Sequence, residues 1–272
     1  ALSGRNIMCS RVEHEAVSSW CSTKLSTDRN GMVDIDKPEH SALQVANSET
    51  GIIQKSVEGI WLSDMTQAFG KVPLAFNWYG CDCAMISAHK IGGPKGIGAL
   101  ILKRGTDLAA LIKGGGQEMG RRSGTENVLG IAGFGAAAEA AQKDLVKGEW
   151  EKISEFRMIL ENMIEEFSDV PILVGKDSKR LPNTTCLITP GWKGETQVMQ
   201  MDLEGIAVSA GSACSSGKVK PSEVLKELGY SESEASCALR VSLGLDTTKD
   251  EVYRFVDTWI KKFKHNFNRK NI

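Results

Sequence analysis

A lysine between two apolar runs constrains this chain more than any other feature of its sequence. The run from Cys83 to Ala88 leads to Lys90, and a glycine-rich turn returns the chain to a second apolar run, Ala99 to Leu102. This pattern predicts a buried strand that ends in a tight loop at the lysine. Enclosure at such a place lowers the pKa of a lysine and frees an amine that can form a Schiff base with a carbonyl compound. A reactive amine is one hypothesis for Lys90, and an ordinary surface lysine beside a turn is the other.

Polar residues follow other strand candidates of the first half. Asn6 to Ser10 is a short strand candidate that precedes His14, and Gly59 to Leu62 is followed by Asp64 and Gln67. Ligands of open α/β sheets bind at the carboxyl ends of strands. We therefore expect these side chains to face a ligand.

One connection in the first half is too short for a parallel crossover that contains a helix. About a dozen residues separate the strand candidate Ser41 to Ala46 from the strand near Ile60, whereas a parallel crossover with its helix usually needs at least about 10–12 residues beyond the loops. Either the two strands are antiparallel, or residues are missing from the sequence as it stands. We favour missing residues.

The second half predicts a long helix and a smaller domain. Residues Val128 to Phe167 have a helical pattern, with a bend expected near Gly148 between two domains. The strands that we expect after it are Thr184 to Ile188, Ile206 to Val208 and Leu239 to Leu243. Thr247 or Thr248 with Asp250 or Glu251 forms a capping box for a last helix, whose core face is Val252, Phe255, Val256, Trp259 and Phe263. The expected domains are residues 1–145 and 146–272.

The neighbours of Lys90 favour pyridoxal phosphate as the carbonyl compound. Asp64 can pair with a protonated pyridine nitrogen, and Gln67 can donate to a phenolic oxygen. Ser87 and His89 flank the lysine and can hydrogen-bond a phosphate. Neither nucleotide-binding glycine motif has the required spacing here.

Three further segments carry chemistry. Cys214 lies among small residues that cannot pack a core, which predicts an exposed nucleophilic thiol on a mobile loop. Arg240 is either part of a structural ion pair or a clamp for a substrate carboxylate. The glycine-rich loop Gly114 to Thr125 is a functional loop or a subunit contact. A single Cys81-Asp82-Cys83 is weak as a metal motif, so we interpret it as strand and expect no metal site.

The composition excludes several classes of protein. The net charge of -1 shows no footprint for nucleic acid, and no apolar run approaches the roughly 20 residues that span a bilayer. Seven irregularly spaced cysteines in 272 residues indicate reduced thiols. We expect a cytoplasmic protein that binds neither nucleic acid nor membrane.

Taken together, these motifs resemble those of the pyridoxal-phosphate-dependent cysteine desulfurases, in the class-V aminotransferase family. The matching group has the longer cysteine-bearing loop and serves iron–sulfur cluster assembly. The resemblance covers nearly the whole chain and is carried by Val12-Glu13-His14, Asp64-Met65-Thr66-Gln67, Ser87-Ala88-His89-Lys90, Gly114 to Thr125, Ser212 to Gly217 and Leu239 to Gly244. It implies a type I fold like that of aspartate aminotransferase: a large domain with a mostly parallel sheet and a small α+β domain.

The resemblance also implies a role for each candidate residue. Lys90 would bind the cofactor as an aldimine, Asp64, Gln67, Ser87 and His89 would hold it, and Thr125 would reach the phosphate in the other subunit of a homodimer. His14 would assist proton transfer, and Arg240 would bind the carboxylate of L-cysteine. Cys214 would take the sulfur as a persulfide, leaving alanine, and pass it to a scaffold or other acceptor protein.

This chain departs from the family pattern in two places. Ser48 stands where the family has an asparagine that contacts cofactor and substrate, and the family's upstream phosphate-binding loop would precede Ala1. The alternatives are an aminotransferase or lyase acting on another amino acid, which does not need Cys214, and a cofactor-free sulfur carrier or scaffold.

Overall fold

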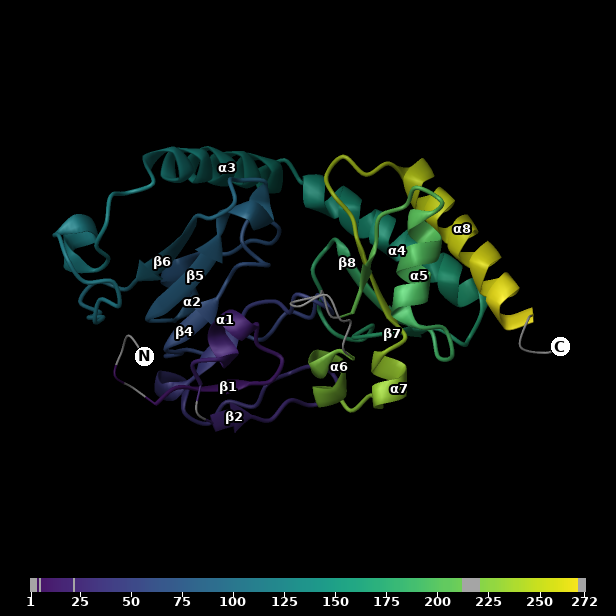
Figure 1. Ribbon diagram of the computed structural model, residues 1–272, viewed down its shortest axis with the longest axis horizontal. Coiled ribbons are helices and arrows are strands. Elements are labelled where there is room, and N and C mark those ends of the chain that lie inside the picture. Colours follow the sequence, from purple (N-terminus) through teal and green to yellow (C-terminus); the bar gives the residue numbers. More distant parts are fainter. Residues whose placement is uncertain (1–3, 5, 22, 212–220, 269–272) are drawn as a thin grey trace. The chain divides into compact units, whose positions relative to one another are not determined.

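The computed structural model of the chain describes residues 4, 6–21, 23–211 and 221–268 (Figure 1). It consists of two compact units. Unit 1 comprises residues 1–26, 32–46 and 54–147, and unit 2 comprises residues 27–31, 47–53 and 148–272.

Unit 1 is built on a mostly parallel sheet with the strand order β3-β4-β5-β6. Its strands are β3 (Ala42–Gln44), β4 (Leu62–Asp64), β5 (Cys83–Ser87) and β6 (Gly98–Leu102). The first three are parallel and β6 is antiparallel to β5. A second, parallel pair joins β1 (Met8–Ser10) to β2 (Thr23–Leu25), and a parallel bridge from Met8 to Ser41 connects this pair to the start of β3.

The helices of unit 1 are short except for the last. They are α1 (Glu15–Ser18), η1 (Pro38–His40), α2 (Phe76–Tyr79), η2 (Ala88–Ile91), η3 (Gln117–Gly120) and α3 (Val128–Val146). Helix α3 packs on η2, the turn that carries Lys90. A Cβ atom on Gly93 would lie 3.2 Å from the side chain of Ala137, so the backbone after η2 lies close against α3.

Strands β3 and β4, which are joined by the short connection, are parallel, so the antiparallel alternative is wrong. Ala42 pairs with Leu62 in parallel register. The chain leaves β3, makes a turn at residues 47–53 that belongs to unit 2, and returns where the backbone amide of Gln54 donates to the carbonyl of Val45 at 2.9 Å. Extended backbone covers about 3.3 Å per residue, so this crossover can return without a helix.

The bend predicted in the long helical segment is confirmed. Helix α3 ends at Val146 and α4 (Glu149–Phe167) begins after Gly148, whose φ of 76° is left-handed. A left-handed residue interrupts a right-handed helix, and glycine adopts that conformation without a steric penalty. The first long segment of unit 2 begins at this glycine.

Unit 2 is an antiparallel sheet with the strand order β7-β8-β10-β9, packed against helices. Its strands are β7 (Ile172–Leu173), β8 (Thr184–Ile188), β9 (Ser209–Ala210) and β10 (Ala238–Ser242). Its other helices are α5 (Gly194–Asp202), α6 (Glu223–Glu227), α7 (Glu232–Ala235) and α8 (Lys249–Asn268).

The strands predicted near β8 and β10 are confirmed, but a strand at residues 206–208 is wrong. The amide of Ile206 donates to the carbonyl of Met201 at 3.0 Å and closes the turn after α5. Pairing begins only at Ser209, opposite Arg240. Ile206 and Val208 pack against the core of the unit instead.

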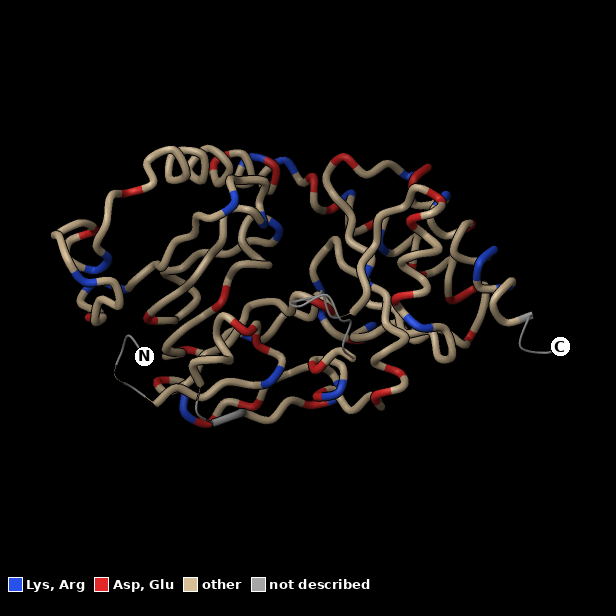
Figure 2. The backbone as a smooth tube through the Cα atoms, viewed as in Figure 1, with Lys and Arg blue, Asp and Glu red and all other residues tan. Residues whose placement is uncertain are grey.

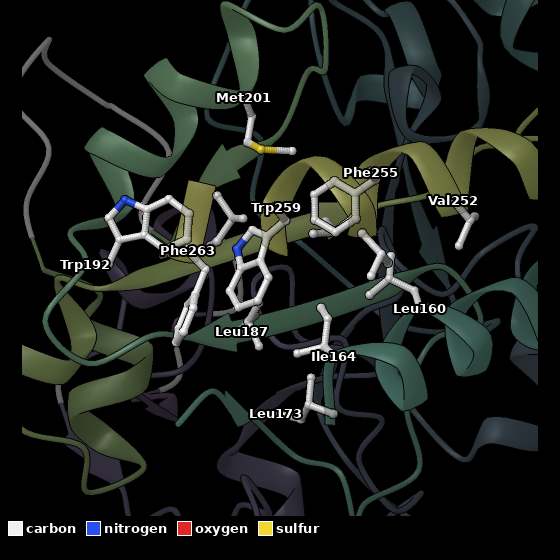
Figure 3. Packing of buried hydrophobic residues seen from close by; sticks show 13 residues of the cluster. Leu160, Ile164, Leu173, Leu187, Trp192, Met201, Val252, Phe255, Trp259 and Phe263 are labelled. Carbon is white, nitrogen blue, oxygen red and sulfur yellow. The ribbon is translucent and has the colours of Figure 1, made fainter. Parts of the chain in front are cut away.

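Helix α8 supplies much of the core of unit 2 (Figure 3). The predicted face is confirmed, since Val252, Phe255, Val256, Trp259 and Phe263 are all buried. The capping box is confirmed as well: the amide of Glu251 donates to Thr248 Oγ1, and the Glu251 carboxylate accepts from the amide of Thr248 at 2.8 Å. The helix therefore begins where its sequence predicts.

Lys and Arg residues are interspersed with Asp and Glu along both units (Figure 2). Within the described residues, no helix is both long and apolar enough to cross a membrane.

Candidate active site

The carboxyl ends of the parallel strands in unit 1 gather most of the candidate residues at one edge of the sheet. Asp64 is the last residue of β4 and Ser87 is the last residue of β5, the neighbouring parallel strand. Lys90 follows in η2. His14 follows β1, which runs parallel to the chain entering β3. Asp64, Ser87 and Lys90 therefore share an edge of one sheet, where ligands of such sheets bind, and His14 follows a strand of the neighbouring pair.

Asp64 is buried, with 8% of its surface exposed. Its Oδ1 accepts from the backbone amide of Thr66 at 2.9 Å, which fixes the carboxylate against the turn that follows β4. Gln67 is half-buried in the same turn. The carbonyl of Gln67 accepts from Lys71 Nζ at 2.9 Å, so a buried lysine holds the turn from its other end.

Ser87 and His89 form a hydrogen-bonded pair beside Lys90. Ser87 Oγ and His89 Nδ1 are 2.8 Å apart. Burial, and then the positive charges of Lys90 and Lys95, lower the pKa of His89 and favour its neutral ring. One of the two protons of this neutral pair lies between the groups, and the other can donate a hydrogen bond to an anion.

The prediction that Lys90 is enclosed is wrong: among the described residues, its side chain is exposed. The residue lies in η2, beyond the end of β5, and Gly92 then turns the chain with a φ of 80°. Among the lysines of this unit whose burial the structure describes, Lys71 is buried, and its pKa falls to about 8 through burial and then through the charge of Lys90. Sequence reasoning missed Lys71, although its apolar neighbours in the printed sequence are a signal.

His14 is held at the start of α1. Its Nδ1 accepts from the amide of Ala16 at 3.1 Å. The preceding residue, Glu13, is buried and accepts from the backbone amide of Gln44 through Oε1. This bond ties the turn before α1 to the end of β3. Thr125, between η3 and α3, is exposed, and among the described residues no hydrogen bond links it to the strand ends.

Arg240 lies in unit 2, in the middle of β10. Its Nη1 donates to the carbonyl of Ser48 at 2.7 Å, and among the described residues its buried Nε has no hydrogen-bond partner. Ser48 therefore contacts Arg240 through its backbone, which any residue at that position provides. Sequence reasoning considered only the side chain at this position.

Glu49, the residue after Ser48, was also not among the residues predicted from the sequence. Burial raises the pKa of the Glu49 carboxyl to about 7, against the lowering effects of the hydrogen bond from Ser222 and the charge of Arg240. Ser222 Oγ donates to Glu49 Oε2 at 2.5 Å and accepts from the amide of Leu225 at 3.1 Å. A carboxyl group that ionises near neutral pH thus lies beside the candidate carboxylate clamp.

Cys214 lies outside the described residues. The other six cysteines are free thiols, and Cys81 and Cys83 are both buried. The interpretation as strand residues is confirmed for Cys83, the first residue of β5, and is wrong for Cys81, which precedes the strand. Among the described residues, no three histidine, cysteine, aspartate or glutamate side chains come together as a metal site.

Comparison with known proteins places this geometry in a family. The family model described as aminotransferase class-V matches residues 3–255. The chain belongs to the class-V aminotransferase family. A relative from Dictyoglomus turgidum named cysteine desulfurase IscS is 37% identical, and the alignment covers 93% of this chain and 71% of the relative. A cysteine desulfurase from Sinorhizobium fredii is 37% identical over 96% of this chain and 75% of its own length.

The solved structures agree. A NifS-like protein from Rickettsia africae matches with a TM-score of 0.84 and 29% identity, covering 97% of this chain and 76% of that one. The predicted type I fold and the resemblance to cysteine desulfurases within the class-V family are confirmed. The alignment with the Dictyoglomus relative spans 281 positions, more than the 272 residues of this chain. That relative therefore has residues within the aligned region that this chain lacks, which agrees with the short connection between β3 and β4 in this chain.

The residues at the strand ends of this class-V chain fit the family cofactor, pyridoxal phosphate. A buried carboxylate is present for the pyridine nitrogen, a hydroxyl–imidazole pair for the phosphate and an exposed amine for the aldehyde. The predicted cofactor is confirmed by family membership. The role of each residue stays a prediction.

Proposed function

We propose that this chain is a pyridoxal-phosphate-dependent cysteine desulfurase that removes the sulfur atom of L-cysteine and leaves L-alanine. The observation that carries the proposal is 37% identity, over more than nine tenths of the chain, to relatives named cysteine desulfurase. The shared sheet edge of Asp64, Ser87 and Lys90 supports it.

When bound, pyridoxal phosphate supplies an electron sink for charge that develops at the substrate's α-carbon. The carboxylate of Asp64 would pair with its pyridine nitrogen, and Gln67 would donate to its phenolic oxygen. Ser87 and His89 would hold the phosphate. In a homodimer, Thr125 of one copy would extend this phosphate site in the other.

Two residues would move protons. Lys90 would hold the aldehyde carbon through Nζ and later carry a proton at the substrate. His14 would assist through Nε2, because its Nδ1 accepts a hydrogen bond from Ala16 and the neutral ring then carries its proton at Nε2.

Arg240 and Cys214 would handle the substrate itself. The guanidinium of Arg240, with an Nε that has no partner among the described residues, would bind the substrate carboxylate. The thiolate of Cys214 would form an S–S bond while the C–S bond of cysteine breaks. The electron pair of that bond stays on carbon, which takes a proton and ends as alanine. The persulfide on Cys214 would then pass its outer sulfur to an acceptor protein of iron–sulfur cluster assembly.

Three preparations loaded with pyridoxal phosphate test the proposal. Wild type should show a visible absorbance band that changes with L-cysteine and should release alanine. Lys90→Ala should lose both the covalent band and alanine release, whereas Lys95→Ala, the matched exposed lysine of the same loop, should keep both. A Lys90→Ala variant with wild-type activity would refute the role of Lys90.

Cys214 separates this reaction from the rival ones. Cys214→Ala should keep the absorbance band but transfer no sulfur to an acceptor, while Cys21→Ala should behave as wild type. Full activity of Cys214→Ala would instead exclude persulfide transfer through Cys214 and favour a lyase or aminotransferase. No absorbance band in any preparation would favour a cofactor-free sulfur carrier. The cytoplasmic location stays a prediction.

A further inference from the structure

We propose that Glu161 is a positioning residue for Arg240. It would act through Arg180 on the turn at residues 47–53, whose Ser48 carbonyl holds the guanidinium ready for a substrate carboxylate. The inference rests on the proposed function, because it concerns the carboxylate-binding role of Arg240. Every residue in this chain of contacts belongs to unit 2.

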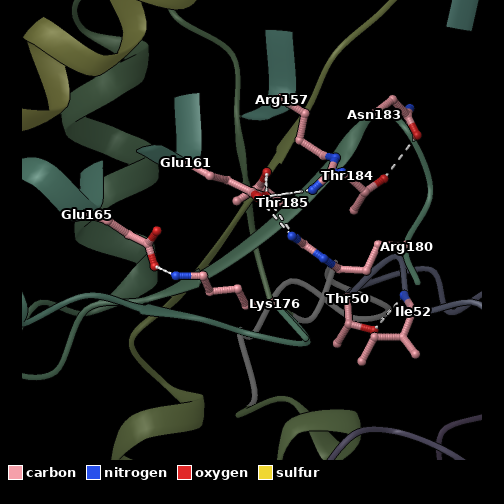
Figure 4. A network of polar contacts seen from close by, with 10 residues as sticks. All are labelled: Thr50, Ile52, Arg157, Glu161, Glu165, Lys176, Arg180, Asn183, Thr184 and Thr185. Atoms are coloured by element: carbon pink, nitrogen blue, oxygen red, sulfur yellow. Dashed lines mark hydrogen bonds and ion pairs between the residues drawn. The ribbon is translucent and has the colours of Figure 1, made fainter. Parts of the chain in front are cut away.

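Glu161 is the centre of a buried ionic network on α4 (Figure 4). Its two carboxylate oxygens accept from Arg180 Nη1 and Nη2 at 2.7 and 2.8 Å. Arg157 Nη1 donates to it at 3.0 Å and Thr185 Oγ1 at 2.7 Å. Burial alone would raise the pKa of Glu161, but these hydrogen bonds and cations hold it below its ordinary value. The carboxylate is therefore ionised and fixes the Arg180 side chain in one orientation.

The backbone around Arg180 holds the turn at residues 47–53. Arg180 lies opposite Ile52 in an antiparallel bridge. On one side of it, the amide of Ile53 donates to the carbonyl of Lys179 at 2.8 Å, and on the other the amide of Leu181 donates to the carbonyl of Gly51 at 2.8 Å. The turn and the segment that carries Arg180 are therefore joined by hydrogen bonds on both sides of the bridge.

The packing around Ile52 leaves little room for this turn to shift. Ile52 is 1% exposed. A Cβ atom on Gly175 would lie only 2.6 Å from Ile52 Cγ1, and one on Gly31 only 2.7 Å from Ile52 Cδ1. Close-packed interiors transmit displacement because no free volume absorbs it.

The turn is held by internal hydrogen bonds and contacts Arg240. Asn47 Oδ1 accepts from the amides of Glu49 and Thr50, both at 2.9 Å. The carbonyl of Ser48, between Asn47 and Glu49, accepts from Arg240 Nη1 at 2.7 Å. Within the described residues this is the hydrogen bond that orients the guanidinium, so displacement of the turn displaces Arg240.

The same helix offers a matched control. Glu165, one turn after Glu161, pairs with Lys176, and both side chains are at least one-third exposed. This pair also joins α4 to the segment that precedes Arg180 (Figure 4). Among the described residues, neither Glu165 nor Lys176 hydrogen-bonds the turn at residues 47–53.

The test compares two ligands of the holoenzyme that differ only in the carboxylate. L-Alanine and ethylamine are titrated separately, and binding is followed by the visible absorbance of the cofactor. In Glu161→Gln, affinity for L-alanine should fall about tenfold to a hundredfold, the range expected for loss of a hydrogen bond between charged groups, while affinity for ethylamine stays within about twofold. For L-cysteine, KM should rise more than kcat falls. Glu165→Gln should match wild type.

Two more variants keep the result decisive. Thr185→Val removes one hydrogen bond to Glu161 and should show a smaller loss of the same kind, which decides the matter if Glu161→Gln does not fold. Arg240→Ala sets the full loss of carboxylate selectivity. If Arg240→Ala loses that selectivity but the Glu161 and Thr185 variants do not, or weaken both ligands equally, the positioning role is refuted. If Arg240→Ala keeps the selectivity, the carboxylate role of Arg240 in the proposed function fails as well.

Discussion

Replacing Glu49 by glutamine should remove a pH-dependent loss of stability. Burial raises the pKa of the Glu49 carboxyl from 4.5 to about 7 in the folded protein. Between these pH values the folded protein holds a proton that the unfolded chain has released, so the free energy of unfolding falls as the pH rises from 4.5 to about 7. At about 1.4 kcal/mol for each pH unit, the loss is roughly 3 kcal/mol.

Glutamine at this position stays neutral at every pH and keeps an oxygen that can accept from Ser222 Oγ. Glu49→Gln should therefore equal wild type in stability near pH 4.5 and exceed it by up to about 3 kcal/mol at pH 8. Urea unfolding at several pH values measures this difference. Trp192 and Trp259 in the core of unit 2 provide the fluorescence signal.

Glu223→Gln is the matched control, since Glu223 is the next residue after Ser222 and its carboxylate is largely exposed, paired with Lys226. Its effect on stability should be small and the same at pH 5 and pH 8. The reasoning about Glu49 would be refuted by a gain in Glu49→Gln that is equal at both pH values, or by wild-type stability that does not fall between them.

Other positions give independent tests. Burial lowers the pKa of Lys71 from 10.5 to about 8, so the free energy of unfolding of the wild type should rise as the pH increases from about 8 to 10.5. In urea unfolding, Lys71→Met should be more stable than the wild type by on the order of 2–3 kcal/mol at pH 7 but by little at pH 10.5. An equal gain in stability at both pH values would contradict this reasoning. Trp259→Ala should cost about 3–5 kcal/mol, seen as a lower midpoint of unfolding, because it empties a fully buried site, and a loss below about 1 kcal/mol would show that the core collapses around it. Gly194→Ala should destabilise the protein by about 1–3 kcal/mol, because the new Cβ would lie 2.3 Å from the carbonyl oxygen of Ala238. Gly135→Ala should not destabilise it, because Gly135 lies on α3 with open space around it. Similar thermal midpoints for the two variants would refute the steric argument.

Local patterns predicted much of this protein correctly. The capping box at Thr248 and the core face of α8 depend on residues within a few positions of one another, so a linear sequence shows them. The break at Gly148 follows from one residue's freedom to take a left-handed conformation. The residue types around Lys90 and at Asp64 also indicated the cofactor, because its chemistry needs a particular set of groups.

Pairing between distant segments decided the rest. Strands β3 and β4 pair in parallel although the turn between them, at residues 47–53, belongs to unit 2, and no local pattern encodes this arrangement. Lys90 proved exposed and Lys71 buried, since burial depends on what the fold brings against a side chain.

The surroundings of Arg240 show the same limit most clearly. The sequence by itself determined which groups this chain has for its chemistry, including the guanidinium of Arg240. The tertiary structure decided that Arg240 is held by a backbone carbonyl from a turn almost two hundred residues earlier, beside a carboxyl group whose pKa burial raises. The physical reason is that hydrogen bonds and desolvation act between neighbours in space, and only the folded chain specifies those neighbours.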